Sequence, residues 1–76
     1  MKPYGSARGH SGVSAYEVGP DWIRIQFDHG GTYEYHEARI GREHLDQLIR
    51  LADAGAGLNT YINQHPVVKN GYTRRS

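Results

Sequence analysis

Cysteine is missing from all 76 residues, which excludes a disulfide framework and any zinc site built on thiolates. No apolar run comes near the roughly 18 residues that a membrane-spanning helix needs, and residues 1–12 lack the apolar stretch of a signal peptide. Hydrophobic residues make up only 37% of the chain, below the roughly 45–50% usual for globular chains, so we expect a thin core. These absences predict one small, soluble, cytoplasmic domain without a membrane partner.

The formal net charge of +1 hides an uneven distribution. Residues 1–12 and 66–76 together hold five cations and no acid, whereas residues 13–65 hold four arginines and eight acids. Polar, glycine-containing basic ends around an acidic centre are typical of mobile arms on a compact body. We therefore expect a flexible basic N-terminal arm at 1–12, an α+β domain at 13–65 and a flexible basic C-terminal tail at 66–76.

Three strands are expected in the first half of the chain. Residues 13–18 and 22–28 mix apolar and polar side chains on either side of Gly19-Pro20-Asp21, where proline suits a turn. The second of these runs alternates apolar and polar residues, and residues 33–36 alternate again after two glycines. Such alternation predicts an antiparallel sheet with one buried face.

The register of the second hairpin can be predicted from the faces of its strands. A loop at residues 29–31 pairs Phe27 with Tyr33 and Ile25 with Tyr35, and so keeps apolar and aromatic side chains together. The last residue of that loop is a glycine, which adopts the left-handed conformation without a Cβ penalty. In this register Arg24 stands opposite His36.

Two helices are expected in the second half. Apolar residues within 41–54 recur at helical spacing, and glycines at 55 and 57 end that segment. A shorter apolar stripe begins at Leu58 and continues to about His65, where Pro66 prevents further helix. The predicted fold is therefore α+β, a three-stranded antiparallel β-meander packed on one face by two C-terminal helices in the order β-β-β-α-α.

A family resemblance supports this fold. The pattern Phe27…Gly30-Gly31-x-Tyr33-x-Tyr35, followed by a helix and then Gly57-Leu58-Asn59-x-Tyr61-Ile62-Asn63, resembles the KTSC domain, which is named for the C-terminus of certain lysyl-tRNA synthetases and also occurs as a small stand-alone bacterial protein. The likeness extends over about residues 11–63 and implies a module without established activity, linked to RNA only through its attachment to a synthetase. The turn at residues 19–22 is tighter than the loop usual in that family, which leaves the first hairpin's register open. The motif residues expected to be structural are Gly31, Tyr33, Tyr35, Gly57, Tyr61 and Ile62.

Three surfaces are candidates for binding RNA or a partner. One is the polar face of the sheet, another is the glycine-rich start of the second helix, where free N–H groups favour a phosphate, and the third is the pair of basic ends. The residues concerned are Trp22, Arg24, His36, Arg42, Asn59, Asn63, Lys69, Arg74 and Arg75.

The sequence favours binding over catalysis. None of the five histidines lies four residues from another, which argues against a metal site, and no flanking pattern marks a catalytic nucleophile. We therefore expect neither cofactor nor enzyme activity. The predicted function is weak binding of RNA (tRNA or single-stranded RNA), or of an RNA-handling protein. The alternative is a protein–protein interaction or self-associating module with Trp22 at its interface.

Overall fold

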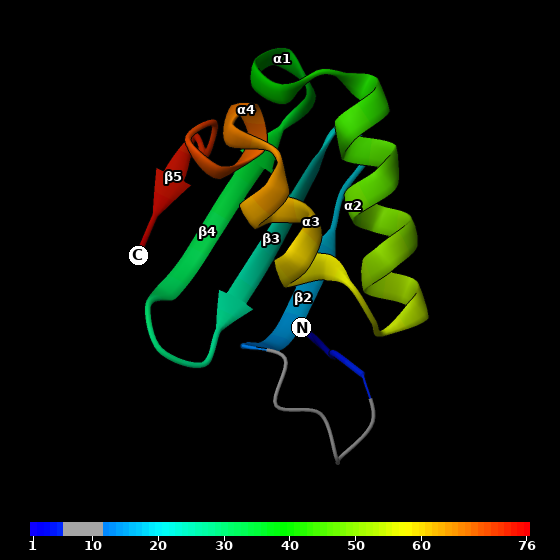
Figure 1. The fold of residues 1–76 in the computed structure, drawn as a ribbon, viewed down its shortest axis with the longest axis vertical. Coiled ribbons are helices and arrows are strands. Elements are labelled where there is room, and N and C mark those ends of the chain that lie inside the picture. Colours follow the sequence, from blue (N-terminus) through cyan, green and yellow to red (C-terminus); the bar gives the residue numbers. More distant parts are fainter. Residues whose placement is uncertain (6–11) are drawn as a thin grey trace.

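The computed structural model describes residues 1–5 and 12–76. Antiparallel neighbours form a single sheet in the order β1-β2-β3-β4-β5, and the helices lie on one face of it (Figure 1). The strands are β1 (Lys2–Pro3), β2 (Val13–Val18), β3 (Trp22–Phe27), β4 (Gly31–His36) and β5 (Arg74–Arg75). The helices are α1 (Glu37–Ile40), α2 (Arg42–Ala54), α3 (Leu58–Gln64) and α4 (Pro66–Lys69).

The α+β class with an antiparallel sheet and helices on it is confirmed, but the expected number of elements was too low. The three expected strands form the centre of the sheet as β2, β3 and β4, and the two expected helices are α2 and α3. Among the described residues, the sheet has five strands rather than three, and there are four helices rather than two. The additional elements have two to four residues each, too few to show a period of their own in the sequence.

Both chain ends contribute to the sheet, although the sequence analysis placed them outside the folded domain. At one edge, Lys2 pairs with Tyr16 of β2. At the other edge, Ser76 exchanges two backbone hydrogen bonds with Thr32 of β4, of 2.8 and 3.0 Å. The edges of a three-stranded sheet have unpaired backbone groups, and the chain ends satisfy part of them here. Arg8, part of the expected N-terminal arm, lies outside the described residues.

The predicted register of the second hairpin is wrong by two residues. Tyr33 pairs with Ile25 rather than Phe27, because the loop consists of residues 28–30 and Phe27 pairs with Gly31. A slip of two leaves every side chain on its predicted face, so Tyr33 does share a face with Ile25. The alternation of residues therefore identified the faces but not the partners.

The slip also changes the cross-strand neighbours on the outer face of the sheet. Arg24 stands opposite Glu34, not opposite His36, and Trp22 stands opposite His36 instead. In the first hairpin, whose register the sequence left open, Val18 pairs with Ile23, and the register shifts between Val13 and Ala15.

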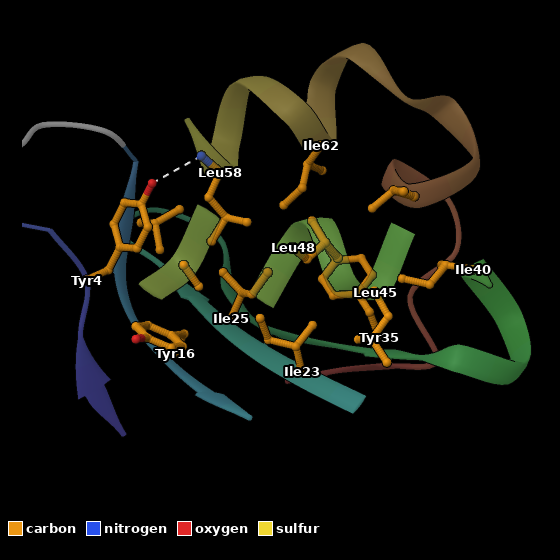
Figure 2. Packing of buried hydrophobic residues seen from close by; sticks show 13 residues of the cluster. Tyr4, Tyr16, Ile23, Ile25, Tyr35, Ile40, Leu45, Leu48, Leu58 and Ile62 are labelled. Atoms are coloured by element: carbon orange, nitrogen blue, oxygen red, sulfur yellow. Dashed lines mark hydrogen bonds between the residues drawn. The ribbon is translucent and has the colours of Figure 1, made fainter. Parts of the chain in front are cut away.

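The core lies between the sheet and the helices (Figure 2). Ile23, Ile25 and Tyr35 point from the sheet toward side chains of the helices. Ile23 and Ile25 are completely buried, and Tyr35 is nearly so. Burying one large apolar side chain contributes about 1.5–3 kcal/mol. The core residues are Tyr4, Val13, Tyr16, Ile23, Ile25, Tyr35, Ile40, Leu45, Leu48, Ala52, Leu58, Ile62 and Val68.

Tyr4 joins the N-terminal segment to this core. Its ring packs edge-to-face on Tyr16, with ring centres 6.5 Å apart. The Leu58 backbone N–H donates a 3.1 Å hydrogen bond to the Tyr4 hydroxyl, which satisfies one of the free donors at the start of α3 (Figure 2). The Tyr16 hydroxyl in turn donates to Asp53 at 2.7 Å and so connects β2 to α2.

No helix among residues 1–5 and 12–76 is long and apolar enough to cross a membrane.

Candidate functional site

The charged residues of the outer sheet face neutralise one another. Arg24 donates to Glu17 at 2.8 Å and to Glu34 at 2.7 and 3.0 Å. The second oxygen of Glu34 lies 2.6 Å from His36 Nε2. The hydrogen bonds from His36 and then from Arg24 hold the pKa of Glu34 below its usual value. Two of the residues expected to bind RNA, Arg24 and His36, are thus already bonded to acids.

Trp22, the third residue expected on this face, is half-buried. The Arg24 guanidinium lies 5.0 Å from the centre of its ring, a cation–π contact. The ring also packs so closely on Gly19 that a Cβ there would come within 2.2 Å of it. Much of the indole is therefore covered by this chain itself.

The structure brings together only part of the predicted phosphate site at the start of α3. The backbone N–H of Leu58 is occupied by Tyr4, as described above. Arg42 lies in the first turn of α2, at the end of that helix farthest from α3 (Figure 1). There it bonds to Glu37 at 2.9 Å and to Asp46 at 3.0 Å. The structure does not bring Arg42 to the two asparagines with which it was grouped.

Those asparagines line a cleft of about 460 Å³ between the β3–β4 hairpin and the helices α3 and α4. Asn59, Asn63 and Lys69, all predicted site residues, meet here. No carboxylate belongs to the described lining of the cleft, although the chain has eight acids. The lining residues are Gly12, Phe27, His29, Gly30, Tyr33, Tyr35, Asn59, Ile62, Asn63, Lys69, Asn70 and Tyr72.

Aromatic rings form one wall of this cleft. Tyr33 makes edge-to-face contacts with Phe27 and Tyr72, with ring centres 5.4 and 4.9 Å apart. The guanidinium of Arg75 lies 5.7 Å from the centre of the Tyr33 ring. Arg75 pairs with Tyr33 in the sheet while Arg74 pairs with Glu34, so the two arginines point to opposite faces. Arg75 therefore stands beside the aromatic wall, and Arg74 lines a hollow of about 130 Å³ on the outer face.

Tyr35 lines the cleft with a side chain that is only 2% exposed. Within the described part of the chain its hydroxyl has no hydrogen-bond partner, yet it is not fully sealed from solvent. Burial, and then the neighbouring Tyr33 and Tyr72, raise the pKa of this hydroxyl far above its usual value. It therefore stays protonated and can donate or accept a hydrogen bond in the cleft.

The remaining motif residues lie in the framework around the cleft. Gly57 directly precedes α3 and has the left-handed conformation, and Ile62 is buried in the core. The Tyr61 hydroxyl lies 2.7 Å from His44 Nδ1, and the Tyr61 ring stacks on His65 with centres 4.0 Å apart. Burial is the main cause that raises the pKa of Tyr61.

In residues 1–5 and 12–76 no group of three or more histidines or acids could hold a metal ion.

Sequence reasoning missed several residues of the cleft. Tyr72 and Asn70 were assigned to a tail, and His29 and Phe27 to a hairpin without a binding role. A signal for Tyr72 did exist, since it is the one aromatic residue in an otherwise polar segment after residue 68.

No protein-family model, curated protein or solved structure matches this chain.

Proposed function

We propose that this chain is a non-enzymatic module of the KTSC type that binds RNA weakly and without sequence preference through its C-terminal edge. Lys69, Arg74 and Arg75 are the residues that meet the phosphates. The resemblance of the Tyr33-x-Tyr35 segment and of residues 57–63 to that domain supports the family and, with it, a cytoplasmic role linked to translation. The positions of these three basic residues support the choice of the C-terminal edge as the RNA-binding surface.

One observation carries the proposal, namely the difference between paired and unpaired cations. Arg24 and Arg42 are each bonded to two acids. Within the described residues, Lys69, Arg74 and Arg75 form no ion pair with an acidic side chain. Within the same residues Lys2, Arg39 and Arg50 form none either, but they line neither the cleft nor the hollow on the outer face, whereas Lys69 lines the first and Arg74 the second. A cation without an acidic partner can neutralise a phosphate, whereas a paired one must first release its own partner.

The number of contacts determines the strength of binding. Three phosphate contacts on a single strand give a slope of about −2 in a plot of log K against log salt, since each contributes about −0.7. Binding that rests on so few contacts is expected at micromolar affinity or weaker, with little discrimination between sequences.

The test is a fluorescence-anisotropy titration of labelled single-stranded RNA and tRNA at two salt concentrations. The variant Lys69→Gln/Arg74→Gln/Arg75→Gln should lose most of the binding and flatten the salt slope by about 2. A matched control, Lys2→Gln/Arg39→Gln/Arg50→Gln, removes the same charge from exposed residues elsewhere and should bind RNA nearly as the unaltered chain does.

Equal loss in the two variants would show that only net charge matters and would refute this surface. Absence of RNA binding at low salt would refute the RNA function altogether. The alternative of a protein interface then applies, and light scattering would measure self-association. Binding through an apolar protein interface should persist as salt rises, whereas binding to phosphates should not.

A further inference from the structure

The cleft offers two kinds of group that can contact a nucleobase. Tyr33 and Tyr72 provide aromatic surface, and Asn59 and Asn63 provide amides that both donate and accept hydrogen bonds. Unpaired bases in RNA are bound in this way, by aromatic contact and by hydrogen bonds to their edges. The two amides are only loosely engaged with each other, with Asn63 Nδ2 3.5 Å from Asn59 Oδ1, so they keep most of their hydrogen-bonding capacity.

Tyr35 supplies an independent observation. It is a nearly buried residue whose hydroxyl makes no hydrogen bond within the described part of the chain. This hydroxyl is not sealed from solvent, so a molecule inside the cleft can hydrogen-bond to it in place of water. A purely apolar ligand, such as an acyl chain, would leave this hydroxyl and the amides unsatisfied.

Size and charge restrict the ligand further. The volume of about 460 Å³ lies within the roughly 300–1,000 Å³ of small-molecule sites. The absence of carboxylates from the described lining, together with Lys69 in it and Arg75 beside Tyr33, favours a ligand with negative charge. A sugar phosphate satisfies the charge but not the aromatic wall, and a neutral base satisfies the wall but not the charge.

We infer that this cleft binds one unpaired nucleotide of single-stranded RNA, with its base among Tyr33, Tyr72 and the asparagines and its phosphate toward Lys69. The inference rests on the proposed function and deepens it, because the C-terminal edge then guides the strand and the cleft takes one base from it. A base inside a duplex cannot enter, so unpaired RNA is preferred to double-stranded RNA.

The test is an NMR titration of the ¹⁵N-labelled full chain with AMP, UMP, adenosine and ribose 5-phosphate. AMP and UMP should shift the backbone amides of cleft residues such as Asn63 and Tyr72. Adenosine and ribose 5-phosphate should each bind at least about fivefold more weakly, because each lacks one of the two contacts. The same chain is then titrated with labelled single-stranded and double-stranded RNA.

Two conservative variants locate the site. Tyr35→Phe keeps the ring and removes only the hydroxyl, and it should weaken AMP binding about three- to tenfold. Lys69→Gln should weaken AMP but leave adenosine nearly unchanged. The matched controls Tyr61→Phe and Lys2→Gln make the same chemical changes outside the cleft and should bind AMP as the unaltered chain does. Thermal melting confirms that each variant is folded.

The outcomes separate this inference from the proposed function. If RNA binds with the expected salt slope but Tyr35→Phe has no effect on RNA or AMP, the cleft inference fails and the basic edge stands. If AMP shifts no cleft amide at millimolar concentration, the inference likewise fails. If AMP binds in the cleft but RNA does not bind at all, both proposals fail, and the cleft is a site for free nucleotides.

Discussion

Gly31 is the position where adding a single methyl group should do the most damage at the surface. It has a φ of +85°, and a Cβ built there would lie 2.1 Å from the backbone oxygen of Ser76. Gly30, its neighbour in the chain, has no positive φ, and no atom lies within 4 Å of the place that its Cβ would occupy. Gly31→Ala and Gly30→Ala are therefore a matched pair that differ only in their surroundings.

The cost of Gly31→Ala has two parts. The left-handed conformation costs a residue with a Cβ about 1–2 kcal/mol. The clash also pushes Ser76 away from Thr32 and breaks their two backbone hydrogen bonds, each contributing about 0.5–1.5 kcal/mol. We expect a total of about 2–5 kcal/mol, which lowers Tm by roughly 8–40 °C in a domain of this size. Gly30→Ala should change stability by less than about 0.5 kcal/mol.

Urea denaturation followed by circular dichroism measures these differences. A chain that lacks Ser76 separates the two parts, because it removes the clashing atom but not the backbone strain. In that chain Gly31→Ala should cost only about 1–2 kcal/mol. Equal stability of Gly30→Ala and Gly31→Ala would refute the observed register, and a cost unaffected by the loss of Ser76 would refute the clash.

Two further predictions concern single hydrogen-bonding groups. Tyr4→Phe removes the hydroxyl that accepts from the Leu58 N–H, and leaving that buried donor without a partner should cost about 1–3 kcal/mol in urea denaturation; a neutral result would mean that water replaces the hydroxyl. For Glu34, the contacts with His36 and Arg24 lower the folded-state pKa, so their stabilisation is present above the unfolded pKa of about 4.3 and is lost as pH falls through the folded value. The stability advantage over Glu34→Gln should therefore shrink between about pH 5 and pH 3, and a pH-independent difference would contradict this account.

The sequence allowed the central elements to be predicted because their signals are local. Alternation marked β3, and helical spacing of Leu45, Leu48 and Ala52 marked α2. The register of the second hairpin could not be derived in the same way, since any shift by two residues preserves the faces. The edge strands β1 and β5 form only because distant backbone groups are available to pair with them.

In the candidate site, too, the residues placed by local spacing could be predicted and those placed by long-range contacts could not. Asn59 and Asn63 were predicted as ligand-binding residues, and the helical spacing of four does place them together on α3. Tyr72 reaches the cleft because Thr73 donates its N–H to the Glu34 carbonyl at 2.7 Å, a contact between segments far apart in sequence. The role of Tyr4 at the start of α3 depends on a contact across 54 positions. Tertiary contacts of this kind leave no periodic trace in the sequence.

The two chain ends also protect the edges of the sheet. β1 pairs with the outer edge of β2 and β5 pairs with the outer edge of β4, and each of these edge strands is only two residues long. Trimming the protein to residues 13–65, the span that reads as a complete domain in the sequence, would leave two six-residue edges open to pairing with other molecules. We therefore expect the shortened chain to be more prone to aggregation than the full chain. A tag fused to either end should leave β1 free to pair with β2 and β5 free to pair with β4.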